Sequence, residues 1–259
     1  MVRVSTRPLS SRQDPIQNPT QNTGQDPASP DVGVPRLSVV IPVFNEEENL
    51  QALFGRLFPT LAACHESYEV ICVDDGSRDA SRSILESQSR EFPQLVVLRH
   101  PTNLGQHNAI LTGFRHARGH WVVTIDADLQ NPPEEIPALV NALQEGYDVV
   151  GTYRVGRRDP WTRRVASRSV NGLIRSIWGV EFRDIGCMLR GYTGEISRQI
   201  TNRADSERQE LFIPAAALQL ANNPIEIPVS HSERAAGRSK YGLRQLLRLS
   251  RNIVKTLRH

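Results

Sequence analysis

Residues 121–133 read WVVTIDADLQNPP, an apolar run that ends on two aspartates separated by one residue. Trp121 to Ile125 carry no charge and are rich in β-branched side chains, which is typical of a buried strand. Asp126 and Asp128 follow where that strand must leave the sheet. Because open α/β sheets bind ligands at the carboxyl ends of their strands, we expect a ligand site there.

Two neighbouring carboxylates repel each other, and the usual remedies are a shared proton or a divalent cation. Gln130 adds a neutral oxygen at the next odd position. The oxygens of Asp126, Asp128 and Gln130 suit Mg²⁺ or Mn²⁺, which keep open positions for substrate phosphates. The alternative is that the two aspartates only cap the helix that Pro133 begins.

Predicted strands and helices alternate on both sides of this stretch. We predict strands at residues 37–43, 68–73, 95–98, 121–125 and 148–153. Helices are expected in the intervals, among them 106–117 and 133–145, with Asp79 as the cap of another. Strict alternation of this kind indicates a mostly parallel sheet with right-handed crossovers, so the sequence predicts an α/β fold.

Polar side chains end three of these strands. They are Asn45 and Glu46, Asp74 and Asp75, and Asp126 and Asp128. A nucleoside diphosphate needs carboxylates for hydroxyl or base N–H groups, a metal for the pyrophosphate, and backbone that approaches closely, as at Gly76 and Gly105. Each turn alone is common in proteins, but together at one sheet edge they predict a nucleotide site.

Other nucleotide-binding motifs are absent from the sequence. A dinucleotide-binding unit would carry GxGxxG after the first strand, where this chain has VIPVFNEEEN, and no P-loop string occurs. Aspartyl phosphotransferases place Thr or Val two residues after a similar aspartate pair, where this chain has Gln130. These classes are therefore disfavoured.

The chain has 259 residues, 39% of them hydrophobic, which is enough for one catalytic domain with appendages. Its three cysteines form no CxxC pair and favour reduced, buried thiols in a cytosolic setting. No apolar run approaches the roughly 18 residues of a membrane span, and the N-terminus lacks an apolar signal core. We therefore expect a protein that is not integral to a membrane.

Charge is divided between the two halves of the chain. Residues 1–150 contain 11 basic and 19 acidic side chains, whereas residues 151–259 contain 20 and 9. A basic second half predicts an anionic partner there: phosphates, nucleic acid or an anionic membrane face.

Seven motifs follow one another along residues 37–250: PVFNEEENL, VDDGSRDAS, NLGQHNAI, IDADLQNPPEEIP, GYDVVGTYR, DIGCMLRGY and GRSKYG. In this order they resemble the family 2 glycosyltransferases of the polyprenyl-phosphate type, such as dolichyl-phosphate mannose synthases and undecaprenyl-phosphate aminoarabinose transferases. The resemblance implies a GT-A fold and transfer of a sugar, with inversion, from a UDP- or GDP-linked donor to a polyprenyl phosphate. It also implies Mg²⁺ or Mn²⁺ as cofactor and a cytoplasmic, peripheral enzyme at the inner face of the cell membrane.

The resemblance assigns roles to individual residues. The nucleotide-binding positions are matched by Pro42, Asn45, Glu46, Asp75 and Asp126, and the metal positions by Asp126, Asp128 and Gln130. The catalytic positions are matched by Asp128, Arg154, Arg168, Arg238 and Lys240. Among these, Arg154 and Arg168 are expected to hold the acceptor phosphate, while the GRSK segment closes on the diphosphate.

An acceptor phosphate changes what the site must do. A hydroxyl acceptor needs a general base, whereas a phosphomonoester, with a second pKa of about 6, is already anionic near neutral pH. The enzyme must instead hold two anions together, which requires a metal and cationic side chains. Asp184 is expected either to contact donor or acceptor or to pair with Arg190. His107 is expected either to lie near the donor or to pack at its helix start.

The sequence divides into three parts. Residues 1–35, rich in Pro, Gln, Asn and Ser, are predicted to be a disordered tail, and residues 36–235 to form the GT-A domain. Residues 236–259 contain GRSKYG and a basic amphipathic helix that suits an anionic membrane surface or, alternatively, docks on the sheet. The related aminoarabinose transferases continue into transmembrane helices. This leaves a peripheral enzyme, a truncated chain, an integral-membrane partner or a homo-oligomer as alternatives.

Two rival functions remain for the sequence. A family 2 transferase with a soluble or polysaccharide acceptor would carry an ED-type base and often QxxRW, and neither string is present. A non-catalytic binder of nucleotide sugars or RNA is disfavoured, because both aspartates are present and the 6% of aromatic residues form no RNA-binding string. The sequence does not disclose the sugar and leans towards a UDP-linked donor.

Overall fold

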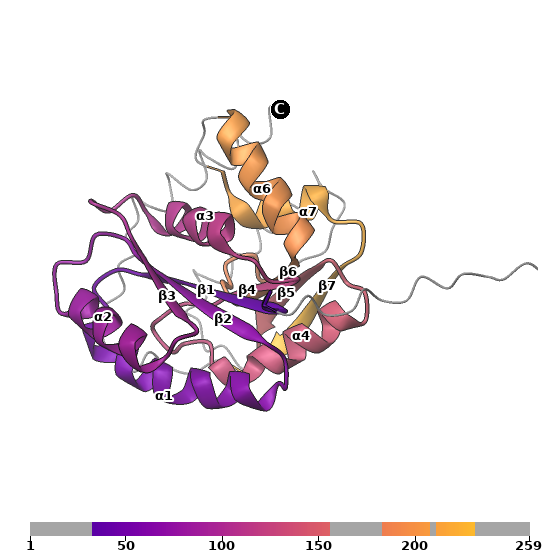
Figure 1. Ribbon diagram of the computed structural model, residues 1–259. Helices are drawn as coiled ribbons and strands as arrows, with labels where there is room; N and C mark the ends of the chain where they lie inside the picture. The colour runs from indigo at the N-terminus through magenta and orange to yellow at the C-terminus, as the bar shows by residue number, and fades with distance from the viewer. Residues whose placement is uncertain (1–32, 156–182, 208–210, 231–259) are drawn as a thin grey trace, which may run out of the picture. The chain divides into compact units, whose positions relative to one another are not determined.

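The computed structural model describes residues 33–155, 183–207 and 211–230, and the folded unit begins at Val34. Its centre is a seven-stranded sheet in the order β3-β2-β1-β4-β6-β5-β7 (Figure 1). The strands are β1 (Leu37–Val43), β2 (Tyr68–Asp74), β3 (Leu95–Arg99), β4 (Trp121–Thr124), β5 (Val149–Arg154), β6 (Arg190–Thr193) and β7 (Pro224–Val229).

β6 is antiparallel to both β4 and β5, and every other neighbouring pair in the sheet is parallel. This confirms the predicted α/β fold with a mostly parallel sheet. All five predicted strands are present, each within one residue of its expected bounds. β6 and β7 are not among the strands predicted from the sequence. β6 is only four residues long and contains a glycine, so it carries little periodic signal.

Helices cover both faces of this sheet (Figure 1). One face carries α1 (Glu47–Ala63), α2 (Ser81–Glu91) and α4 (Ile136–Gln144), and the other carries α3 (Gln106–His116), α6 (Gly194–Glu207) and α7 (Ile213–Leu220). The predicted helix from Pro133 is present, although its first turn is a 3₁₀ helix, η1 (Pro133–Glu135). Among the residues described, no helix combines the length and the apolar character that crossing a bilayer requires.

β1 shows how the two-residue period of a strand fills both core layers. Leu37, Val39 and Ile41 are fully buried among the side chains of α1, whereas Val40 belongs to the layer under α3. Gly113 allows α3 to approach this strand closely, because a Cβ added there would lie 2.3 Å from Cγ1 of Val40. The central strand is thus packed from both sides and forms a rigid support for the residues that follow it.

The strand order reverses between β1 and β4, and the two strands separate there. Their pairing ends at Val40 and Thr124, while β1 continues to pair with β2 as far as Val43. The carbonyl of Val40 accepts a hydrogen bond from the backbone N–H of Ile125. Because alternate residues of a strand direct their backbone groups to the same side, residues 38, 40 and 42 direct theirs towards β4. Since β4 has ended by then, the missing N–H of Pro42 interrupts no ladder, which explains a proline in a central strand. Such reversal points are where open α/β sheets bind ligands.

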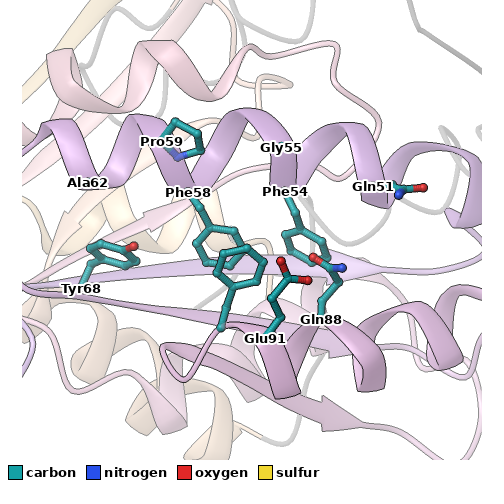
Figure 2. A pocket seen from close by; sticks show the side chains of 10 residues that line it. Gln51, Phe54, Gly55, Phe58, Pro59, Ala62, Tyr68, Gln88 and Glu91 are labelled. Atoms are coloured by element: carbon teal, nitrogen blue, oxygen red, sulfur yellow. The ribbon is translucent and has the colours of Figure 1, made fainter.

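A shallow apolar groove of about 530 Å³ lies between α1 and α2 (Figure 2). The rings of Phe58 and Phe92 stack in its floor with their centroids 3.8 Å apart, and Phe54 and Tyr68 extend it. Its lining comes from the middle of α1, the end of α2 and the first residue of β2. The groove therefore belongs to the helix-covered face and not to the carboxyl edge of the sheet.

Candidate active site

The carboxyl edge of the sheet gathers the polar residues that the sequence analysis selected. Asn45 follows β1, Asp74 ends β2, Asp126 follows β4 and Arg154 ends β5. Because β6 runs in the opposite direction, the segment that precedes it, residues 183–189, also meets this edge. Residues from five places in the sequence are thus brought to one side of the sheet.

The turn after β4 holds Asp126 and Asp128 in different environments. Asp126 is partly exposed and accepts a 2.6 Å hydrogen bond from the side-chain amide of Gln106. Asp128 is only 7% exposed and accepts the backbone N–H of Gln130 at 3.1 Å. Leu129, between Asp128 and Gln130, has φ of +60°, a left-handed conformation that is costly for a branched side chain and is often retained at functional sites.

Neither aspartate caps the following helix. The cap position of η1 is Pro132, and neither η1 nor α4 has a side-chain cap hydrogen bond. The alternative that these carboxylates serve only as helix caps is therefore wrong.

The donor set at this turn fits a hard divalent cation. In the described ranges, three or more His, Cys, Asp or Glu side chains nowhere gather as a metal site would require. A site built on two carboxylates is incomplete for zinc, which takes four protein ligands in structural sites and three in catalytic ones. It suits Mg²⁺, which is held by one or two carboxylates and completes its shell with substrate phosphates and water. The residues present therefore fit the ion that the sequence analysis expected.

The segments after β1 and β2 bind each other. Asn45 has φ of +52°, which asparagine tolerates better than most residues. Its backbone N–H donates to Oγ of Ser77 at 3.0 Å, and its Oδ1 accepts the N–H of Arg78 at 2.8 Å. The N–H of Glu46 donates to Oγ of Ser81 at 2.8 Å. Two of the predicted nucleotide-binding residues are thereby held in place by the start of α2.

Asp74 and Asp75 are both buried, but they have different partners. The carboxylate of Asp75 lies 2.7 Å from Nδ1 of His100 and accepts the backbone N–H groups of Leu104 and Gly105 at 2.8 Å each. One oxygen of Asp74 accepts the N–H of Ser77 at 2.9 Å. The other has no hydrogen-bond donor among the described residues and lies 3.8 Å from Nε of Arg99. Asp75 is thus committed to the turn at residues 102–105, whereas Asp74 retains an open acceptor.

Arg154 forms a two-pronged ion pair with Asp184. Its Nε and Nη2 donate to the two carboxylate oxygens at 2.6 and 3.0 Å, and both side chains are about 15% exposed. The expected alternative paired Asp184 with Arg190, whereas the ion pair observed for its carboxylate is with Arg154. The fully buried guanidinium of Arg190 instead donates to backbone carbonyls of Asp184, Ile185 and Cys187.

The segment before β6 is fixed from several further directions. The hydroxyl of Thr124 donates to the carbonyl of Met188, and the hydroxyl of Thr152 to that of Leu189, both at 2.7 Å. The carboxylate of Glu226 accepts the N–H groups of Arg183 and Asp184 at 2.7 and 3.0 Å. Arg154 therefore faces a carboxylate whose backbone is held by β4, β5 and β7.

Several predicted residues have other outcomes. His107 packs edge-on against Phe212 with ring centroids 5.5 Å apart, as the packing alternative expected. Gln106 was not assigned a role from sequence, although it stands in the NLGQ motif that could have indicated it. Some predictions lie outside the described residues: Arg168, Arg238, Ser239, Lys240 and the helix predicted for residues 241–259.

A mostly parallel sheet with one inserted antiparallel strand, and carboxylates at its reversal point, is the arrangement of the GT-A fold. The chain belongs to glycosyl transferase family 2, because its residues 38–202 match the model of that family. It is a glycosyltransferase. The expected family and fold are thereby confirmed.

Curated relatives are similar to most of this chain. It is 48% identical over 225 residues to an undecaprenyl-phosphate 4-deoxy-4-formamido-L-arabinose transferase from Edwardsiella ictaluri, covering 85% of this chain and 67% of the relative. A protein of the same description from an Enterobacter species is 47% identical over 226 residues, with 86% and 67% covered. The chain thus spans about two thirds of the length of these relatives.

Solved structures share the fold at lower identity. Glucosyl-3-phosphoglycerate synthase from Mycobacterium tuberculosis, crystallised with Mn²⁺, UDP and glucosyl-3-phosphoglycerate, is 19% identical with a TM-score of 0.59 over 87% of this chain and 79% of that one. TarS 1-349 from S. aureus, crystallised with UDP-GlcNAc, is 21% identical with a TM-score of 0.52, over 80% and 62%. These likenesses concern the fold.

Proposed function

We propose that this chain transfers a sugar, with inversion, from a UDP-linked donor to a polyprenyl phosphate, with Mg²⁺ or Mn²⁺ as cofactor. The observation that carries the proposal is the 48% identity, over 85% of the chain, to a transferase named for undecaprenyl phosphate. The geometry of the carboxyl edge supports it, because several carboxylates, an acceptor oxygen of Asp74 and the guanidinium of Arg154 meet there.

The donor side of the proposal uses the residues after β1, β2 and β4. Asp126 and Asp128, with Gln130, would hold a divalent ion, which would supply positive charge to the leaving diphosphate. The open oxygen of the buried Asp74 is suited to accept a base N–H, since a buried acceptor without a donor is costly. Pro42, Asn45, Glu46 and Asp75 shape the surrounding wall, with Asp75 acting through the turn that it binds.

The acceptor side of the proposal rests on Arg154. A phosphomonoester needs no general base to attack the anomeric carbon, so the chain must attract and orient an anion. The planar guanidinium of Arg154 already binds the two oxygens of Asp184, a geometry that also matches phosphate. We assign the remaining positive charge to Arg168, Arg238 and Lys240, and membrane-surface contact to residues 236–259, at the inner face of the cell membrane.

An extraction assay tests this function. The protein is incubated with Mn²⁺ or Mg²⁺, undecaprenyl phosphate and a panel of radiolabelled UDP- and GDP-sugars, and label is counted in the organic phase. We expect label from one UDP-sugar, abolished by EDTA. Nucleotide released only with a soluble or polysaccharide acceptor, and no extractable label, would refute the lipid acceptor and favour the alternative transferase.

A further inference from the structure

We propose that His100 is a positioning residue of the donor site, which acts through Asp75 on the turn at residues 102–105 and on Gln106. His100 follows β3, is 7% exposed and belongs to none of the motifs that indicated the family. The inference rests on the proposed function only in taking this edge as the nucleotide site.

The imidazole joins three elements at the carboxyl edge. Its Nδ1 lies 2.7 Å from Oδ1 of Asp75 at the end of β2, and its Nε2 lies 2.9 Å from the hydroxyl of Thr112 on α3. An ionised carboxylate only accepts, so Nδ1 carries the hydrogen in that contact. In the neutral ring Nε2 then accepts from Thr112, and the hydroxyl and carboxylate fix the orientation of the ring.

Asp75 passes this orientation to the turn before α3. The same oxygen that accepts from His100 also accepts the N–H of Leu104, and the other oxygen accepts the N–H of Gly105. Residues 101–104 are exposed, so these contacts with the buried Asp75 hold the turn from its inner side. Gly76 adds a steric contact, because a Cβ there would lie 2.7 Å from the carbonyl carbon of Thr102.

The turn at residues 102–105 fixes the position of the first residue of α3. Gln106 immediately follows Gly105, and its amide donates to Oδ1 of Asp126 at 2.6 Å. A chain of direct contacts therefore connects His100 with one of the two carboxylates proposed to bind the metal. Removing the imidazole leaves Asp75 with one donor fewer and a space beneath the turn, so Gln106 and Asp126 lose their fixed separation.

The test measures nucleotide affinity by calorimetry with the full chain and Mn²⁺, using UDP, or GDP if UDP does not bind. We expect His100→Ala to weaken binding about tenfold, as for loss of a hydrogen bond to a charged group. His100→Asn places an amide N–H near the position of Nδ1 and should restore most of the affinity. His120→Asn, at the exposed amino end of β4, is the matched control and should bind as the wild type does.

A double-mutant cycle separates positioning from a merely structural role. If His100 acts through Gln106, the double variant His100→Ala, Gln106→Ala should bind the nucleotide at most about twofold more weakly than the single variant with the lower affinity. Fold-losses that multiply in the double variant, or wild-type affinity in folded His100→Ala, would overturn the proposal. Should His100→Ala not fold, Thr112→Val replaces it, with roughly threefold weaker binding expected and unchanged affinity counting against the proposal.

The two proposals fail in different ways. A wild-type protein that binds the nucleotide but labels no lipid would refute the proposed acceptor and leave the His100 measurements valid. A protein that labels lipid normally, with unchanged nucleotide affinity in folded His100→Ala, would refute the positioning role alone.

Discussion

Asp74 and Asp75 are adjacent in sequence, yet the structure gives their carboxylates different surroundings. The family resemblance assigns Asp75 to the nucleotide, and that assignment stays a prediction. The sequence alone does not distinguish the two carboxylates, because the partners of Asp75 stand 25 to 30 residues later in the chain. The presence of carboxylates at this edge was predictable from strand ends, whereas the direction of each carboxylate depends on hydrogen bonds made only in the folded protein.

Asp128→Ala tests the proposed metal position at the residue scale. Removing one of two carboxylates should weaken Mn²⁺-dependent UDP binding by at least about tenfold, because the remaining protein ligands cannot replace its charge. Calorimetry with and without Mn²⁺ measures the difference. Asp205→Ala, at an exposed ion pair on α6, is the control and should bind normally. Unchanged affinity in Asp128→Ala would contradict the metal role.

Gly76→Ala tests the contact between the β2 turn and residues 102–103. Gly76 has φ of +72°, and an added Cβ would lie within 2.8 Å of backbone atoms of both Thr102 and Asn103. We expect at least about 1–2 kcal/mol loss of stability in urea unfolding, together with weaker UDP binding.

The control for this change is Gly55→Ala. Gly55 lies within α1 and lines the groove of Figure 2, where an added Cβ meets nothing within 4 Å. The free energy of unfolding of the Gly55→Ala variant should rise by up to about 1 kcal/mol, because alanine loses less conformational freedom in a helix than glycine does. A Gly76→Ala protein as stable as the wild type would show that the turn can move away.

At the scale of elements, sequence periodicity predicted the first five strands and the helices between them. It did not predict that β6 enters between β4 and β5, since strand pairing depends on side-chain contacts far apart in sequence. The buried guanidinium of Arg190, which binds three carbonyls of the preceding segment, illustrates the difficulty. An arginine in a short strand carries no sequence signal of burial.

The starts of α1 and α2 depend on Asp79, which gives a pH-dependent prediction. Burial alone would raise the pKa of Asp79, but hydrogen bonds from Ser81 and from the backbone of Glu47 outweigh it and lower the net pKa. Because the pKa is lower in the folded state, ionised Asp79 stabilises the fold at pH values above the unfolded-state pKa of about 3.9. This contribution is lost as the pH falls from there through the lower pKa of the folded state.

We therefore expect Asp79→Ala to reduce the free energy of unfolding by about 1 kcal/mol at pH 7, as for other helix-start residues. The difference from the wild type should shrink below about pH 4, where the native carboxylate also becomes protonated. Urea unfolding at several pH values measures both. Glu145→Gln, at the exposed residue that follows α4, should leave the curve unchanged. A difference that is constant from pH 7 to pH 3 would contradict this account.

For the whole molecule, the cysteines report on cooperative unfolding. Burial raises the pKa of the Cys72 thiol in β2, and burial, opposed by a hydrogen bond from Thr152, raises that of Cys187. Cys64 is only partly buried, although burial and Glu66 raise its pKa as well. The prediction of reduced thiols agrees with three free cysteines, two of them fully enclosed.

Alkylation at pH 7 should therefore label Cys64 slowly in the native protein and leave Cys72 and Cys187 unmodified. In denaturing urea all three should react at similar rates, which peptide mass spectrometry can follow. If Cys187 reacted as fast as Cys64 without denaturant, the segment before β6 would open more readily than its hydrogen bonds indicate.

The insertion of β6 also has a consequence for the order in which the protein is synthesised. β5 is complete at Arg154, but both of its partners, β6 and β7, begin later in the chain, at Arg190 and Pro224. At about 5–20 residues per second, a ribosome needs seconds to supply them. During that interval β5 has two unpaired edges, while β1, β2, β3 and β4 can already form a sheet. The nascent chain therefore assembles the strands that lead to Asp74 and Asp126 before it can hold Asp184 against Arg154.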